Sequence, residues 1–242
     1  MVFSPKGYCG DEVMSKYLTK AGSYLDIHGL YGFFYGCLAA SKEGMPSGCL
    51  PMILSREDAA SETEEESQAM ITGIMKLWNI LSRWNPECEP LVFPDMDYIV
   101  SKNGLRERVE DDISLINYFI EGLDLGGADE SDLSDEGLDA LRYLSEADFF
   151  LDKYTELTGH DDVGGDAIEK TFDLIDQMEE IVVECIARIT IDLKEAIPGA
   201  RKDPGIFSDD KTERFRGARI WGHDICPCGS GRKYRKCCGL TH

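Results

Sequence analysis

One feature restricts the fold more than any other: a long stripe of apolar residues at helical spacing between residues 165 and 196. The stripe consists of Ile168, Phe172, Ile175, Met178, Val182, Ile186, Ile189 and Leu193. Its period of three to four residues predicts an amphipathic helix from Gly165 or Asp166 to Ala196, and Pro198-Gly199 ends it. Shorter stretches with the same period predict helices over residues 11–20, 24–40, 59–84 and 105–123. The sequence therefore predicts an all-α fold.

The segment 24–40 is apolar on nearly every face and has glycine along one of them. Ser23 and Asp26 stand three residues apart, which is typical of a capping box that starts a helix at residue 24. The glycines at i, i+3 and i+7 are Gly29, Gly32 and Gly36. Each costs a helix about 1 kcal/mol relative to alanine, so a compensating close contact is expected. We expect helix–helix packing within the domain, with a dimer interface or a ligand groove as the alternatives.

Four of the nine cysteines lie within thirteen positions, as Cys226-Pro227-Cys228 followed after eight residues by Cys237-Cys238. Four thiolates at this spacing suit a closed tetrahedral Zn²⁺ site, and the spacing leaves iron open as an alternative. Because a closed site has no free position for water or substrate, the site is predicted to be structural and not catalytic. A vicinal disulfide at Cys237-Cys238 or unligated thiols would fit the same spacing.

Charge divides the chain into two parts of opposite sign. Residues 211–242 contain eight Lys/Arg and two Asp/Glu, a net charge of +6, and the rest of the chain carries −27. Prolines, glycines and a shift to basic composition mark residues 198–221 as a flexible linker. We therefore expect an acidic all-helical domain at residues 1–197, then the linker, and a small zinc knuckle at residues 222–242.

Acidic residues are densest between residues 121 and 180, where the sequence has twenty acidic and only three basic residues. Apolar residues continue at helical spacing through this segment, so the acids are expected on the solvated faces of amphipathic helices. A calcium site stays an alternative, although the aspartates lack the spacing of an EF-hand loop. These aspartates are Asp129, Asp132, Asp135 and Asp139.

The chain has neither an apolar run of about eighteen residues nor the apolar core of a signal peptide at its start. The five cysteines outside the knuckle are scattered singly, which is typical of a reducing compartment. They are Cys9, Cys37, Cys49, Cys88 and Cys185. We expect a soluble, cytoplasmic protein.

The cysteine-rich stretch resembles the SEC-C motif, a small metal-binding element of the SecA translocation ATPase and of many bacterial proteins. The matching positions are Cys226, Cys228, Gly229, Ser230, Gly231, Lys233, Tyr234, Cys237 and Cys238. The resemblance implies zinc held by the four cysteines. Upstream, the chain has Gly222-His223-Asp224-Ile225 where that family often has Arg-Asn-Asp-Pro, so His223 is an alternative ligand.

The body resembles the YecA/YgfB family of all-helical bacterial proteins, some of which carry a SEC-C element. The residues that carry this resemblance are Asp26-Ile27-His28-Gly29-Leu30, Gly32-Phe33-Phe34, Cys49-Leu50-Pro51 and Phe119-Ile120-Glu121-Gly122-Leu123. The resemblance implies a helical fold and a bound metal, but no reaction.

The knuckle concentrates basic residues around one aromatic side chain, and these are the expected partner-binding residues. They are Arg232, Lys233, Tyr234, Arg235 and Lys236. Clustered cations attract nucleic acid and anionic membranes in a salt-dependent way. The family resemblance implies ribosomes, acidic lipid or the acidic chaperones of protein export as partners.

We predict a non-enzymatic, metal-binding interaction protein. RNA binding without sequence preference, docking of the tail on its own acidic body, and mere solubilisation of the knuckle are the alternatives.

An enzyme is the alternative from another class. A hydrolase would use His28 together with acids such as Asp26 or Asp112 in a groove of the helical body. Because no second histidine or nucleophile stands near His28 in the sequence, a structural histidine is the expectation. The sequence leaves a homodimer open.

Overall fold

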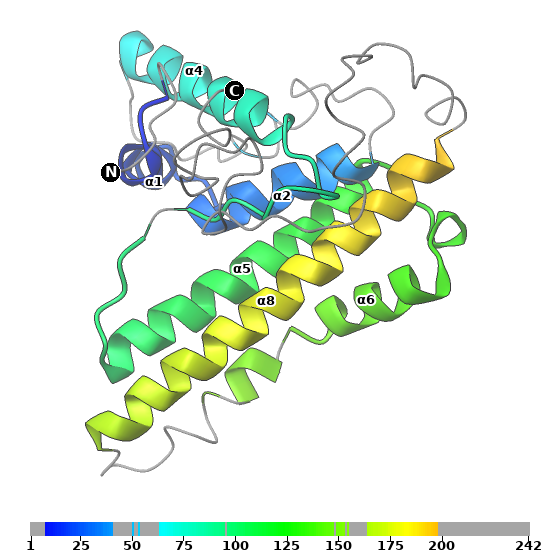
Figure 1. Ribbon diagram of the computed structural model, residues 1–242. Coiled ribbons are helices and arrows are strands. Elements are labelled where there is room, and N and C mark those ends of the chain that lie inside the picture. The colour runs from blue at the N-terminus through cyan, green and yellow to red at the C-terminus, as the bar shows by residue number, and fades with distance from the viewer. Residues whose placement is uncertain are drawn as a thin grey trace, which may run out of the picture.

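A computed structural model gives the architecture of the chain (Figure 1). It describes residues 8–40, 63–94, 96–147, 149–152 and 164–197, together with residues 50, 53 and 154. The elements are the α-helices α1 (Asp11–Lys20), α2 (Ile27–Ala40), α4 (Glu64–Leu81), α5 (Lys102–Leu125), α6 (Asp135–Ser145) and α8 (Gly165–Ala196), with the 3-10 helix η2 (Glu130–Asp132). Within these ranges every element is helical, which confirms the predicted all-α fold.

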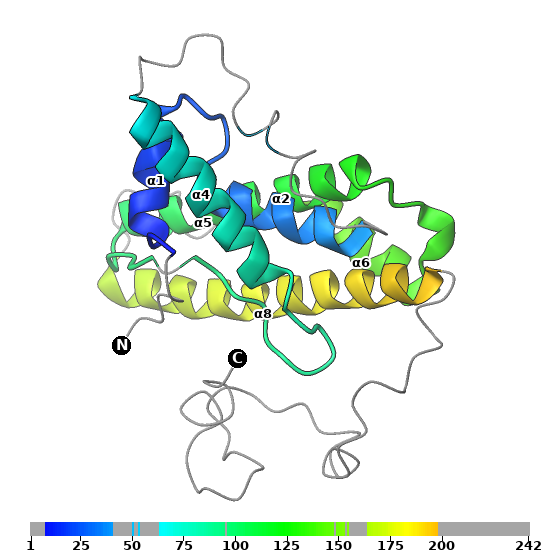
Figure 2. The same cartoon turned by 90° about the horizontal axis from the view of Figure 1, so that it is seen from above.

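Three helices form the centre of the molecule. Helices α2, α5 and α8 lie side by side and run in the same direction in both views (Figures 1 and 2). Helix α6 packs along α8 in the opposite direction, and α1 and α4 cover the other side of α2. The apolar stripe of α8 supplies buried residues along most of its length, as the sequence predicts. Those residues include Ile175, Val182, Ile186, Ile189 and Leu193.

Helices α2 and α5 approach each other so closely that their main chains are in contact, and glycines allow this approach. A Cβ atom added at Gly32 would overlap the main-chain oxygen of Leu115, and one added at Gly36 would overlap that of Phe119. From the other side, Gly122 of α5 leaves room for the main chain of α2 at Phe33. The glycine face is therefore buried inside the domain, which confirms the prediction of helix–helix packing over a dimer interface or a ligand groove.

Side-chain caps fix where the helices begin. Thr63 and Glu66 form a capping box at the start of α4, while Ser101 caps α5 and Ser134 caps α6. Each cap satisfies a main-chain N–H group that has no partner within the helix. Helix α4 therefore begins at residue 64 and not at residue 59, because the capping residue Thr63 has an extended backbone.

The predicted start of α2 at residue 24 is also wrong. The Ser23 hydroxyl accepts a hydrogen bond from the nitrogen of Leu25, 3.0 Å away, which forms a local turn. The Asp26 carboxylate then accepts from the nitrogen of Gly29 at 2.6 Å, so Asp26 and not Ser23 caps the helix. Local hydrogen bonds of this kind compete with helix formation and delay it by one turn.

A polar contact holds α6 to the end of α8. Asp192 is buried and accepts hydrogen bonds from the nitrogen and the hydroxyl of Ser134, at 3.0 and 2.6 Å, and from Arg188. Burial opposes ionisation of Asp192, but the hydrogen bonds from Arg188 and Ser134 outweigh it and leave its pKa below the ordinary value. The same Ser134 hydroxyl caps α6, so one carboxylate positions the start of that helix.

Aromatic side chains fill the space between α2 and α4. The rings of Phe34 and Trp78 meet edge to face with centroids 5.0 Å apart, and those of Tyr35 and Trp84 do so at 5.1 Å. On α4, Met70 and Leu77 are buried, while Ile71 and Met75 are only half-buried. No helix in the described part of the chain is both long and apolar enough to cross a membrane.

The predicted division at residue 198 falls at the edge of the described residues. The long helix α8 ends at Ala196, two residues before Pro198, as predicted. The predicted linker (198–221) and knuckle (222–242) lie outside the described residues. Of the scattered cysteines, Cys9, Cys88 and Cys185 are free thiols, Cys37 is buried in the core, and Cys49 lies outside the described residues.

Candidate functional site

The residues of the predicted metal site and its basic surface lie outside the described part of the chain, so the structure does not place them. They are Cys226, Cys228, Arg232, Lys233, Tyr234, Arg235, Lys236, Cys237 and Cys238. The alternative ligand His223 lies outside it as well. Within the described residues no group of three or more His, Cys, Asp or Glu side chains is arranged to hold a metal ion.

The helical body contains a polar cluster at the start of α2, formed by the buried His28 and the half-buried Tyr98 and Asp111. The Tyr98 hydroxyl donates to an Asp111 carboxylate oxygen at 2.8 Å and lies 3.2 Å from His28 Nε2. His28 Nδ1 lies 3.5 Å from the other oxygen of Asp111. Because the single proton of Tyr98 goes to Asp111, its oxygen accepts from a protonated Nε2. The ring thus meets a carboxylate on one side and a phenol on the other.

Burial controls the charge of this cluster. His28 is 4% exposed, and its Nδ1 has no hydrogen-bond partner of good geometry in the described chain. Burial lowers the pKa of His28, although the Asp111 carboxylate opposes that shift. Burial also raises the pKa of Asp111. A neutral histidine held between two residues of the body is therefore the state that the surroundings favour near neutral pH.

A second polar cluster joins α5 to α8 and consists of the buried Asp112, the half-buried Arg108 and Glu179, and the exposed Asp176. Arg108 Nε donates to Glu179 at 2.6 Å, and its terminal nitrogen pairs with Asp176. The guanidinium also lies over the rings of Tyr98 and Phe172, with centroid distances of 5.9 and 5.7 Å. Arg108 therefore links α8, α5 and the connection that precedes α5.

Asp112 is the least solvated acid of this cluster. It is 6% exposed, and one of its oxygens has no hydrogen-bond partner within the described chain. Burial and the neighbouring charge of Glu179 raise the pKa of Asp112 well above its ordinary value, against the effect of Arg108. Asp112 can therefore keep its proton where an exposed aspartate has lost it.

Asp112→Asn is expected to change how stability depends on pH. The unfolded chain releases this proton near pH 4, but the folded chain holds it, so rising pH progressively favours unfolding of the wild type. Asparagine has no carboxyl proton to release and removes that effect. We expect the melting temperature of the variant relative to wild type to rise from pH 5 to pH 8, as measured by circular dichroism. The exposed Asp139 provides the control, since Asp139→Asn should show a flat difference. A flat difference for Asp112→Asn would contradict the argument.

The alternative prediction of a hydrolase pairs His28 with Asp26 or Asp112. In the structure, neither of these two carboxylates is the one that faces the imidazole. Asp111, and not Asp112, faces the imidazole, while Asp26 caps α2. A general base needs access to a substrate. Three cavities of the described chain are each lined by other residues.

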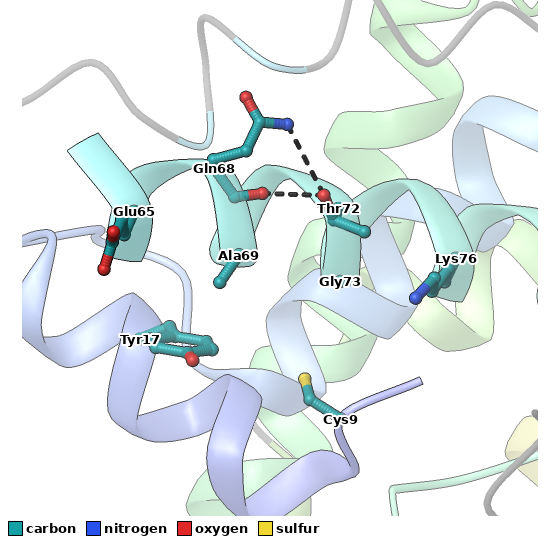
Figure 3. A pocket seen from close by; sticks show the side chains of 8 residues that line it. All are labelled: Cys9, Tyr17, Glu65, Gln68, Ala69, Thr72, Gly73 and Lys76. Atoms are coloured by element: carbon teal, nitrogen blue, oxygen red, sulfur yellow. Dashed lines mark hydrogen bonds between the residues drawn. The ribbon is translucent and has the colours of Figure 1, made fainter. Parts of the chain in front are cut away.

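The largest of these cavities is an open groove of about 640 Å³ between α1 and α4 (Figure 3). Tyr17 and Cys9 line one side and small residues of α4 line the other, with Glu65 and Lys76 toward opposite ends. Burial raises the pKa of the Cys9 thiol, so it is poorly suited to act as a nucleophile near neutral pH. We assign no chemistry to this groove.

Comparison with known proteins identifies the segment that the structure does not describe. Residues 224–240 match the SEC-C motif, and this match spans all four predicted cysteine ligands. The chain is also similar to the protein translocase subunit SecA of Syntrophomonas wolfei, with 38% identity over 66 residues, and of Lawsonia intracellularis, with 42% over 43 residues. These alignments cover 27% and 18% of this chain, but only 8% and 5% of the respective SecA chains.

The helical architecture also occurs in a solved structure. The crystal structure of the lpg0076 protein from Legionella pneumophila superposes with a TM-score of 0.56 at 18% identity, covering 76% of this chain and 95% of that one. At this identity the likeness concerns the fold alone. The family to which the body belongs is thus not established by these matches, whereas the motif at residues 224–240 is. This chain contains a SEC-C motif.

Proposed function

We propose that this protein is a non-enzymatic interaction protein whose SEC-C motif binds a metal ion and presents a basic surface to a partner. The observation that carries the proposal is the match of residues 224–240 to the SEC-C motif. The similarity to SecA, a protein translocase subunit, supports a role linked to protein export. The chain spans less than a tenth of the length of these SecA relatives, so only the shared segment enters the proposal.

The donor set of the motif fits Zn²⁺. Cys226, Cys228, Cys237 and Cys238 would supply four thiolates, which fill a tetrahedral shell and leave no position for a substrate. Iron is the other metal that such a donor set accepts. The metal would hold together an element too short to bury a sufficient apolar core. Its contribution is therefore structural, and partner binding falls to the side chains around it.

The basic side chains of the motif are the proposed contact surface. They are Arg232, Lys233, Arg235 and Lys236, grouped around Tyr234. Their charge complements an acidic partner, and we propose an export-linked chaperone or the ribosome. We further propose that the body belongs with YecA/YgfB-type proteins, supplies a second binding surface and works in the cytoplasm. Acidic lipid or RNA as the partner would be distinguished by the experiment that follows.

Replacing Arg232, Lys233, Arg235 and Lys236 together by alanine is expected to abolish salt-dependent binding. Each cation contributes about 1 kcal/mol at an anionic surface, so removing all four should weaken binding about a thousandfold. Binding is measured by co-sedimentation with ribosomes and by titration with single-stranded RNA and with anionic vesicles, each at several salt concentrations. The titrant that loses affinity identifies the class of partner.

A matched variant distinguishes loss of the basic surface of the motif from loss of positive charge anywhere on the chain. Arg106, Arg142, Lys16 and Lys170 lie on the body, and their replacement by alanine removes the same charge elsewhere. Equal binding by wild type and the tail variant in all three titrations would rule out the basic surface as the contact site.

A further inference from the structure

The long helix α8 is buried unevenly along its length. Within this helix, all of which the structure describes, the second half (residues 181–196) has seven buried residues, whereas the first half (residues 165–180) has two, Thr171 and Ile175. The second half lies beside α2 and α6, while the first half extends past them along the start of α5 (Figure 1). Because segments that bury few side chains open most easily, the first half is expected to be the less stable part of α8.

A polar link to α5 holds the first half of α8 in place. Arg108 of α5 pairs with both Asp176 and Glu179, which lie on the first half of α8. The same guanidinium lies over the ring of Phe172, one more residue of that half. The packing of the first half of α8 therefore depends on the charges around Arg108.

Ionisation of Asp112 would unbalance these charges. The carboxylates of Asp112, Asp176 and Glu179 would then place three negative charges around the one positive charge of Arg108, a net charge of −2. Asp112 is 6% exposed, so water screens its charge poorly. Uncompensated charge is costly in such a place. A proton on Asp112 reduces the surplus to a single negative charge.

The charged neighbours of Asp112 lie on α8 and on α5 itself. Glu179 from α8 and Asp111 from α5 favour the protonated form of Asp112, and Arg108 favours the ionised form. Burial adds to the effect of the two carboxylates, and together they raise the pKa of Asp112 well above its ordinary value. The other titratable groups nearby are Tyr98 from the connection before α5 and His28 from α2, both of which contact Asp111.

Opening of the first half of α8 would return Asp112 to water, where its pKa is about 4. At lower pH the proton is bound in both the closed and the open form, so pH does not change their ratio. Between this value and the raised pKa of the closed form, each pH unit favours opening by up to about tenfold. Above the raised pKa the effect is complete. Rising pH therefore weakens the packing of the first half of α8, and acid preserves it.

We propose that the proton on Asp112 is a pH-sensitive switch, which keeps the first half of α8 packed against α5 and releases it when the proton is lost at rising pH. The second half stays packed, because its own buried residues hold it. Release exposes Thr171 and Ile175, which are buried in the closed form. The switch uses residues of the body alone, so it does not rest on the function proposed for the SEC-C motif.

The test is hydrogen–deuterium exchange of the full chain between pH 5 and pH 8, with rates corrected for the pH dependence of amide exchange itself. Peptides from residues 169–180 should be at least about tenfold less protected than peptides from residues 182–193, which reports the separate opening of the first half. Their protection should also fall about tenfold from pH 5 to pH 8. Asp112→Asn has no carboxyl proton to release, so its first half should show no such fall.

Asp173→Asn is the matched control, because Asp173 is an exposed acid on the same half of α8. It should reproduce the fall seen in wild type. Glu179→Gln is a second variant for the case that Asp112→Asn does not fold, as judged by circular dichroism. It removes the negative charge beside Asp112 and should make the fall smaller.

Four results would overturn the proposal. Equal protection of the two halves would show that α8 opens only with the whole molecule. Constant protection of the first half from pH 5 to pH 8 would show that its opening releases no proton. An undiminished fall in Asp112→Asn or in Glu179→Gln, or a fall abolished by Asp173→Asn, would assign the pH dependence to another group.

Discussion

Replacing Cys226 and Cys228 by serine is expected to reduce the bound metal from about one ion per chain to none. Two of four ligands are then lost, and the remaining adjacent pair does not complete a tetrahedral shell. Metal binding to comparable small elements contributes about 10–16 kcal/mol of apparent free energy at neutral pH, which is also their folding energy. Elemental analysis of the purified protein measures the effect, and the same analysis distinguishes zinc from iron.

The helical body provides the control for this experiment. Cys9 and Cys88 are exposed free thiols, so their replacement by serine removes two cysteines without touching the motif. That variant should keep its full metal content. The melting temperature of the body should be the same in both variants, because its core lies in helices that do not include the motif. Full metal content in the Cys226/Cys228 variant would show that the ion is held elsewhere.

Gly32→Ala is expected to lower the free energy of unfolding of the body by about 3 kcal/mol or more. The added Cβ would overlap the main-chain oxygen of Leu115, and a main-chain atom cannot turn aside as a flexible side chain can. Helices α2 and α5 would have to separate along much of their contact. Chemical denaturation followed by circular dichroism measures the loss, and Gly36→Ala should behave similarly.

Gly165→Ala tests whether the effect comes from this close contact. Nothing lies within 4 Å of a Cβ atom at Gly165, which opens α8. Alanine there should be neutral or stabilising by up to about 1 kcal/mol, because it favours the helix over the unfolded chain. Similar losses of stability for Gly32→Ala and Gly165→Ala would contradict the packing account.

The helices themselves could be predicted because their signals are local. The α8 stripe repeats over many turns and is closed by Pro198, and the structure confirms its bounds from Gly165 to Ala196. The first residue of a helix was harder to predict where more than one residue could cap it. At α2 both Ser23 and Asp26 can cap, and the outcome depends on which main-chain nitrogen each hydrogen bond reaches.

The two polar clusters could not be predicted from spacing. Tyr98 and His28 are 70 residues apart, and Arg108 and Glu179 are 71 apart, so no periodic pattern connects them. Asp112 did appear among the candidate residues, but its neighbour Asp111 is the one that faces His28. On a helix two adjacent residues point in directions about 100° apart, and only the packing of α5 decides which of them meets α2.

The metal motif is the opposite case, because four cysteines at short spacing predict a metal site without reference to the fold. The match of residues 224–240 to the SEC-C motif confirms the predicted resemblance of this stretch to that motif. The metal and the partner remain predictions. The charge of the motif indicates which class of partner surface it binds. Shape complementarity decides which protein is the partner.

The most direct test of the account is a quantitative pull-down with three baits: the full chain, the chain truncated after Arg219, and the Cys226→Ser/Cys228→Ser variant. We predict that ribosomal or export-linked proteins are retained by the full chain and lost to the same extent from the other two. Retention of the same proteins by all three baits would contradict a metal-dependent interaction through the SEC-C motif.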